Sequence, residues 1–129
     1  MKWQEYPYSF ENLEQQLSRI DAKKHSLDEK RPLPAYALKS IKESLSLEWT
    51  FNSNGIEGNT LTLQETKLII EEGITIKGKS LREHFEAFNH QNAIEFIEKL
   101  AQSKTQFTDR TILEVHELVL ASIEKEIAG

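Results

Sequence analysis

The stretch SNGIEGNTLTL, from Ser53 to Leu63, decides how this chain folds. It follows a long amphipathic run, and Gly58 and Asn59 are the two residue types best suited to stop a helix. The same stretch places the carboxylate of Glu57 one helical turn after the hydroxyl of Ser53. An acid at a helix end with an abrupt stop behind it is a positioned charge, so we expect Glu57 to meet a cation.

Helical signals dominate on both sides of this stretch. We expect a first helix from Phe10 to about Lys24, a polar connector from His25 to Pro34, and a second helix that Pro34 opens. The second helix carries apolar residues at helical spacing, which predicts a buried stripe. That stripe consists of Leu38, Ile41, Leu45, Trp49 and Ile56.

Three further helices are predicted downstream from their start signals. Thr62 to Glu65 and Ser80 to Glu83 have the form of capping boxes, and Thr108 can cap a last helix. The first of these helices ends at Gly73. The longer helix after Ser80 has a stripe of Phe85, Phe88, Phe96 and Leu100, and the last has a stripe of Ile112, Val115, Val119, Ile123 and Ile127.

Only the segment Ile74-Thr75-Ile76 alternates like a strand, and Gly73 and Gly78 flank it. The predicted fold class is therefore all-α, a helical bundle with one short β-hairpin. We expect an N-terminal helix and linker over residues 1–34 and a second region over residues 35–129.

Composition limits the classes of function. The 129 residues fit one soluble domain, and a formal charge of −5 argues against nucleic acid or an anionic membrane as the main partner. The absence of cysteine excludes disulfides, thiolate metal ligands and a cysteine nucleophile. No apolar stretch approaches the roughly 20 residues that span a bilayer, and no signal peptide is evident. We expect a cytoplasmic protein.

One motif match needs to be weighed against its context. Residues 73–80, GITIKGKS, satisfy the pattern G-x-x-x-x-G-K-S of a phosphate-binding loop. Such a loop follows a buried strand, whereas Lys67 to Glu72 has the pattern of a helix end. The βαβ alternation of nucleotide-binding sheets is also missing. We therefore favour a hairpin with glycine corners over a nucleotide site.

The histidines suggest little chemistry by themselves. Glu86 and His90 lie four residues apart on one predicted helical face and would make half of a metal site. No second cluster converges on them in the sequence, and His116 lacks an H-E-x-x-H context. We expect structural hydrogen bonds at these positions and no metal site.

Several segments together resemble the Fic family. Ser53 to Leu63 is similar to the inhibitory-helix motif (S/T)-x-x-x-E-(G/N) of these proteins. Gly78 to His84, continuing through Glu86 to His90, resembles the segment that follows the family's flap. Ile112 to His116 and the terminal Ala128-Gly129 resemble the helix that precedes its catalytic region. The resemblance covers about residues 35–129.

The chain also departs from the family pattern. Fic enzymes carry their chemistry on a motif of the form H-P-F-x-(D/E)-G-N-G-R-x-x-R, which is absent here. The resemblance implies AMP transfer from ATP to a protein hydroxyl, assisted by Mg²⁺, for a complete enzyme. We expect no catalytic residue in these 129 residues, no cofactor bound by this chain alone, and no activity without the missing motif.

The resemblance implies roles for individual residues. Glu57 would pair with the second arginine of the catalytic motif and displace the ATP γ-phosphate from it. Ser53 would fix the helix end or the orientation of Glu57, and Gly58 would let the chain turn away. The alternatives are that Ser53 and Glu57 only terminate a helix, or that the chain is a non-enzymatic regulator that supplies an inhibitory helix to a separate Fic enzyme. An unrelated helical interaction domain is a third alternative.

The extended segment and the last helix imply partners. By resemblance, a flap formed by Gly73, Ile74, Thr75, Ile76, Lys77, Gly78 and Lys79 would align a protein substrate, with Ile76 as the apolar clamp; otherwise it is a plain connector. The last helix has an apolar face from Ile112 to Ile127, which would be left exposed in the isolated chain. We therefore expect this face to pair with a second copy of the chain.

Overall fold

The computed structural model describes residues 13–103 and 105–123. The chain divides into two compact units, residues 1–38 and 39–129. The first unit holds α1 (Leu13–Asp28), none of whose residues is buried. No helix in the described ranges is long and apolar enough to cross a membrane.

Helix α1 continues four residues beyond the predicted end at Lys24. The Lys24 ammonium pairs with Asp28 at 2.9 Å, one helical turn later, and neither proline nor glycine lies between Lys24 and Pro32. Residues 25–28 are therefore helical and not part of the connector that the polar sequence predicted. The predicted start at Phe10 lies outside the described residues.

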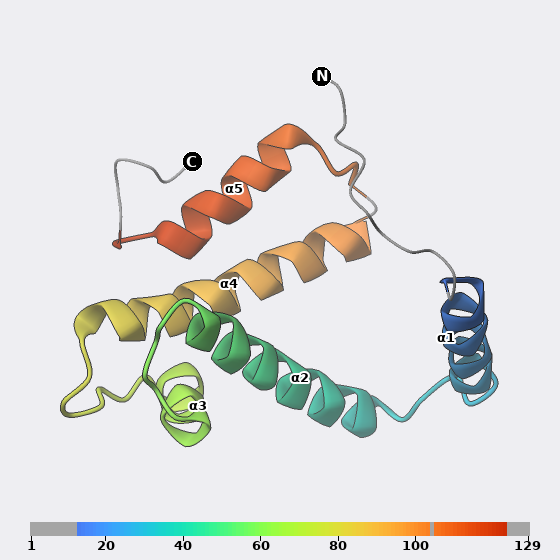
Figure 1. Cartoon of the computed structure of the whole chain (residues 1–129), viewed down its shortest axis with the longest axis horizontal. Coiled ribbons are helices and arrows are strands. Elements are labelled where there is room, and N and C mark those ends of the chain that lie inside the picture. The colour runs from blue at the N-terminus through green and yellow to red at the C-terminus, as the bar shows by residue number, and fades with distance from the viewer. Residues whose placement is uncertain (1–12, 104, 124–129) are drawn as a thin grey trace. The chain divides into compact units, whose positions relative to one another are not determined.

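The second unit is built around α4 (Leu81–Ser103). Figure 1 shows α5 (Asp109–Leu120) along one side of α4. Helix α3 (Leu63–Glu72) lies on the opposite side, near the start of α4. Helix α2 (Ala35–Ile56) begins in the first unit and runs antiparallel to α4, since Lys42 meets Glu98 and Thr50 meets His90. The small core consists of Leu61, Ile69 and Ala87, against which Ile76 packs.

The predicted starts of the three downstream helices are confirmed. Thr62 and Glu65 form a reciprocal capping box at α3, and Thr108 caps α5 through Thr111. At α4, the backbone N–H of Glu83 donates to Ser80 Oγ while the Glu83 carboxylate accepts from the Ser80 N–H. Helix α3 ends at Gly73, whose φ of 66° is in the left-handed region that glycine tolerates.

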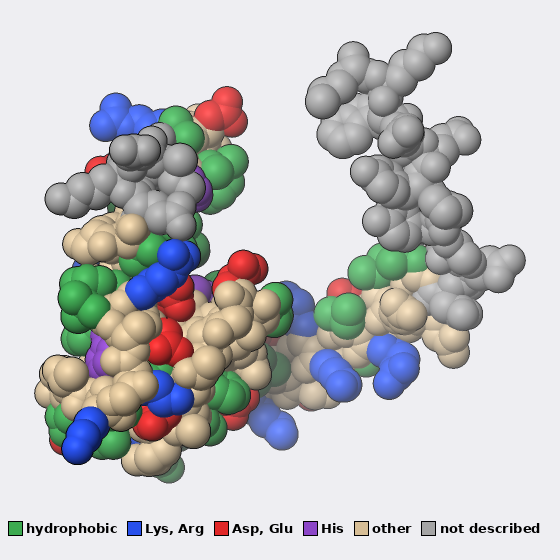
Figure 2. Space-filling view, turned by 60° about the vertical axis from the view of Figure 1, so that its left-hand side comes forward, with side chains coloured by type: hydrophobic (Ala, Val, Ile, Leu, Met, Phe, Trp, Pro, Cys, Tyr) green, Lys and Arg blue, Asp and Glu red, His purple; other side chains and the backbone are tan. Residues whose placement is uncertain are grey.

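The predicted buried stripe of α2 is wrong. All five of its residues are at least half exposed, and Ile56 is 84% exposed. The side of α2 that faces α4 instead carries Lys42, Ser46 and Thr50. The apolar stripe lies beside that side, and of its residues Trp49 meets the ring of His90 on α4. On the face drawn in Figure 2, hydrophobic side chains accordingly lie at the surface among charged ones.

The predicted stripes of α4 and α5 are only partly buried. On α4, Phe85, Phe96 and Leu100 are half-buried and Phe88 is exposed, while its buried residues include Ala87, Ala93 and Ile94. On α5, Ile112 is exposed and Val115 and Val119 are half-buried. Ile123 follows the end of α5, and Ile127 lies outside the described residues. Self-association through this face stays a prediction.

The all-α class is confirmed, but the predicted β-hairpin is not formed. Over the described ranges the chain contains five helices and no strand. The segment from Gly73 to Ser80 is a loop with one turn, in which the Lys79 N–H donates to the Ile76 carbonyl. The Ile76 N–H is engaged by the side chain of His84, so a partner strand cannot use it.

Asn89 fastens α5 to α4. Its buried side-chain amide donates to the carbonyls of Val119 and Ala121 at 3.0 and 2.7 Å. These carbonyls lie at the C-terminal end of α5, where helical partners run out. One asparagine therefore satisfies two acceptors that the helix leaves open.

We expect Asn89→Ala to lower the free energy of unfolding by about 1–3 kcal/mol, because it leaves these carbonyls without their donor. Urea denaturation followed by circular dichroism measures the change. Asn92→Ala is the matched control, since Asn92 is exposed on the same helix. Equal midpoints for both variants would contradict the role of Asn89.

Candidate functional site

The site begins with the way in which α2 ends. The Gly58 N–H donates to the Gly55 carbonyl and the Asn59 N–H to the Asn54 carbonyl, which together form a Schellman motif. Gly58 has a φ of 93°, a conformation that an L side chain rarely adopts. The predicted role of Gly58 as the residue that turns the chain away has this geometric basis.

Glu57 stands at this helix end as an exposed carboxylate. Across the described residues, no hydrogen bond or ion pair reaches its side-chain oxygens. The C-terminal end of a helix carries a partial negative charge, so the fold offers Glu57 no local electrostatic compensation. The carboxylate is thus available to a cation from outside the described chain.

Ser53 and Asn54 lie half-buried in the preceding turn. No hydrogen bond joins Ser53 to Glu57 in the part of the chain that the structure describes. The side-chain nitrogen of Asn54 is buried and also finds no acceptor there. The predicted role of Ser53 in orienting Glu57 therefore has no direct contact behind it.

The loop after Glu57 is held by the carboxylate of Glu83. One oxygen of this carboxylate accepts from the N–H and the hydroxyl of Thr60 at 2.9 and 2.6 Å. The other accepts from the N–H and the hydroxyl of Ser80 at 2.8 and 2.9 Å. The Thr60 hydroxyl, followed by the backbone N–H groups of Ser80 and Thr60, lowers the pKa of Glu83 from 4.5 to about 2.

Two other side chains strengthen this attachment. Asn59 donates to the Glu83 carbonyl and to the Glu86 carboxylate, and its own side-chain oxygen accepts from the Leu61 N–H. The Lys79 ammonium donates to the carbonyl and the hydroxyl of Thr60. The end of α2 is therefore tied to the start of α4 within a few residues of Glu57.

The segment from Gly73 to Ser80 is not a phosphate-binding loop. A helix, α3, precedes it where such a loop needs a strand. Lys79, which would bind phosphate, instead bonds to Thr60 and lies 3.7 Å from the Glu65 carboxylate. Ile76, the expected apolar clamp of a flap, packs against the core.

His84 anchors this loop. Its Nε2 accepts from the Ile76 N–H at 2.9 Å, and its Nδ1 lies 2.6 Å from the Ser80 carbonyl. Since the N–H can only donate and the carbonyl can only accept, the ring is neutral with its proton on Nδ1. His84 is thus a buried structural residue that fixes both ends of the turn.

Glu86 and His90, the two residues that would make half of a metal site, both form hydrogen bonds within the chain. Glu86 binds Asn59 and Arg82, while the Nδ1 of His90 bonds to the hydroxyl of buried Thr50 at 3.0 Å. His90 also meets Trp49 edge to face, and burial lowers its pKa. Within the described ranges, no three His, Cys, Asp or Glu side chains converge to hold a metal ion.

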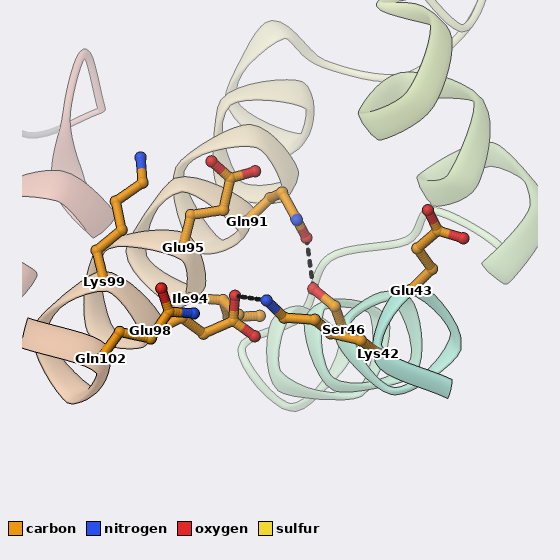
Figure 3. Close-up of a pocket in the computed structure, with 9 residues that line it drawn as sticks. All are labelled: Lys42, Glu43, Ser46, Gln91, Ile94, Glu95, Glu98, Lys99 and Gln102. Atoms are coloured by element: carbon orange, nitrogen blue, oxygen red, sulfur yellow. Dashed lines mark hydrogen bonds and ion pairs between the residues drawn. The ribbon is translucent and has the colours of Figure 1, made fainter. Parts of the chain in front are cut away.

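A polar groove of about 360 Å³ lies between α2 and α4. In Figure 3, Lys42 reaches Glu98 and Ser46 reaches Gln91 across it. These side chains bridge the two helices in place of an apolar seam. The groove is open and carries both signs of charge, so its geometry favours no particular ligand.

Named proteins are similar to this chain over most of its length. "Protein adenylyltransferase Fic" from Drosophila willistoni is 33% identical over 111 residues, which is 86% of this chain and 22% of the relative. The protein of the same name from Culex quinquefasciatus is 33% identical over 121 residues, which is 92% of this chain and 24% of the relative. No family model matches the chain.

A solved structure agrees with these relatives. Residues 134–508 of Fic-1 from C. elegans superpose with a TM-score of 0.71 at 32% identity, covering 87% of this chain and 36% of that one. The chain is therefore homologous to Fic proteins over most of its own length. It spans 22% and 24% of the two relatives' lengths.

Sequence reasoning identified the helix end but missed what holds it. The sequence predicts a capping box from Ser80 to Glu83, yet the second partner of the Glu83 carboxylate, Thr60, lies 23 residues away in the sequence. Asn59 was recognised as a helix stop and not as a bridge to Glu86. Only the mixture of Asn, Thr and Glu in two segments that both flank helices hinted at these contacts.

We expect Glu83→Gln to lower the free energy of unfolding at pH 7 by about 1 kcal/mol, because the amide cannot accept from both Thr60 and Ser80 and solvent screens the rest. The stabilisation by ionised Glu83 is fully present above pH 4.5 and is lost as the pH falls toward about 2. The difference between the two proteins should therefore shrink over this range.

Urea titrations from pH 7 to pH 2.5 measure this difference. Glu95→Gln is the control, since Glu95 is exposed on the same helix. A difference between wild type and Glu83→Gln that stays constant with pH would contradict the assignment.

Proposed function

We propose that this chain is the autoinhibitory part of a Fic protein that transfers AMP from ATP to a protein hydroxyl. The single observation that carries the proposal is the state of Glu57. Its carboxylate is exposed, has no partner in the described chain, and stands beside a loop that Glu83 and Asn59 hold in place. The homology to proteins named adenylyltransferases supplies the reaction.

The inhibitory mechanism follows from what a fixed carboxylate can bind. A planar guanidinium pairs with a carboxylate through two parallel hydrogen bonds, which is a strong and directional interaction. In a Fic enzyme, Glu57 would hold the arginine that otherwise binds the γ-phosphate of ATP. The phosphates would then be misplaced, and in-line attack on the α-phosphorus would fail.

The rest of the proposal concerns the complete enzyme. ATP and Mg²⁺ would bind to the catalytic region, whose motif this sequence lacks, so these 129 residues alone would transfer no AMP. We propose that the enzyme acts on proteins in the cytoplasm. Target docking by residues 73–79 has less support, because the hairpin is not formed and Ile76 packs into the core.

A second candidate function rests on the absence of the catalytic motif from the sequence. In that case the chain would supply its inhibitory helix to a separate Fic enzyme. The continuation of the native reading frame distinguishes the two, since an H-P-F-x-(D/E)-G-N-G-R motif downstream of Gly129 makes a separate enzyme unnecessary.

We expect Glu57→Gly, in the protein at its full natural length, to raise AMP transfer by at least about tenfold, because it frees the arginine for ATP; that factor corresponds to about 1.4 kcal/mol. Incorporation of label from ATP labelled on the α-phosphate measures the change. Glu72→Gly is a matched control, since Glu72 is also an exposed acid at a helix end followed by a left-handed glycine.

Unchanged incorporation in Glu57→Gly, or an equal rise in Glu72→Gly, would refute the inhibitory role. If the reading frame lacks the catalytic motif, the same two variants are added to a separate Fic enzyme. Wild-type chain should then lower its AMP transfer, and Glu57→Gly should not.

A further inference from the structure

The loop from Gly73 to Ser80 is unusual in how it is fixed. The Ile74 N–H donates to the Leu68 carbonyl, and the Ile76 N–H donates to His84. Ile76 also packs against the core, which holds the middle of the loop to the protein. Thr75 thus lies between two anchored neighbours.

Thr75 itself makes no such contact. Its side chain is exposed, and its backbone N–H, carbonyl and hydroxyl have no hydrogen-bond partner in the described ranges. Since side chains alternate along non-helical extended backbone, the inward position of Ile76 turns Thr75 outward. The loop therefore presents one hydroxyl together with free backbone groups that an edge strand can bind.

The other loop hydroxyls of the described chain are either hydrogen-bonded or lie on backbone of a different conformation. Each of five is hydrogen-bonded within the chain: Thr60, Thr62, Ser80, Thr105 and Thr108. Ser122 has no such bond, but its φ of 62° places it in a left-handed turn that cannot pair as a strand. Thr75 is the loop hydroxyl that is both unbonded and free of such a turn.

We propose that Thr75 is a modification site, at which the hydroxyl accepts AMP from the same enzyme or a second copy of it. This inference rests on the proposed function. The Thr75 oxygen attacks the α-phosphorus of ATP and forms a new P–O bond. The bond from that phosphorus to the β-phosphate oxygen breaks, pyrophosphate leaves, and the hydroxyl proton passes to a base of the transferring enzyme.

The modification would have a local consequence. An adenylyl group adds a negative charge and a bulky base next to Ile76 and three residues after the acidic end of α3 at Glu72. The loop is exposed at Thr75, so the group can be accommodated without disturbing the core.

The experiment uses the protein at its full natural length with Glu57→Gly, incubated with ATP and Mg²⁺. Trypsin releases residues 68–77 as the peptide LIIEEGITIK, in which Thr75 is the only hydroxyl side chain. A mass increase of one adenylyl group on this peptide therefore identifies the site. We expect Thr75→Val to abolish the adduct, Thr75→Ser to retain it, and Ser122→Ala to leave it unchanged.

The outcomes separate this inference from the proposed function. AMP on other peptides or other proteins, with none on residues 68–77, overturns the assignment of Thr75 and leaves the enzyme's activity standing. An adduct on this peptide that persists in Thr75→Val also overturns it. The absence of AMP transfer to any protein overturns the proposed function, and the Thr75 site with it.

Discussion

The carboxylate of Glu83 is the constraint on which the second unit depends. Four hydrogen bonds converge on its two oxygens, two from Thr60 and two from Ser80. These bonds join the loop that leaves α2 to the residue that starts α4, beside the small core in which Leu61 and Ala87 lie. Because two backbone hydrogen bonds form the Schellman turn at Gly58, the contacts of Thr60 also constrain the direction in which α2 ends. The position of Glu57 is a consequence of this chain of contacts.

No contact within the described chain stabilises the carboxylate at position 57. A carboxylate at the C-terminal end of a helix faces the negative end of the helix dipole, and no cation lies against it. The apolar stripe of α2, from Ile41 to Ile56, is exposed beside it. The acid and most of the stripe are features of one helix that the described contacts do not explain, and both fit the proposed inhibitory role.

Sequence patterns predicted the helices better than they predicted burial. The capping residues Thr62, Ser80 and Thr108 mark starts correctly because a cap is a local interaction over three residues. Burial of Ile41 or Leu45 depends on what lies opposite, and the sequence of α2 does not contain that information. For the same reason, Glu57 and Gly58 were found from their own helix end, whereas Thr60 to Glu83 and Asn89 to α5 join residues more than 20 positions apart.

The loop from Gly73 to Ser80 shows why a motif needs its context. Its glycines occupy left-handed positions at Gly73 and Gly78, as turns require, and its lysine is in the place that a phosphate-binding loop prescribes. A helix precedes it, however, so its backbone N–H groups do not converge on an anion. The Ile76 N–H instead donates to His84. Lys79 donates to Thr60 and forms an ion pair with Glu65. Lys79, which would bind phosphate in a nucleotide site, therefore helps to hold the loop after α2. Its ammonium is already bound by the carbonyl and hydroxyl oxygens of Thr60 and by the Glu65 carboxylate.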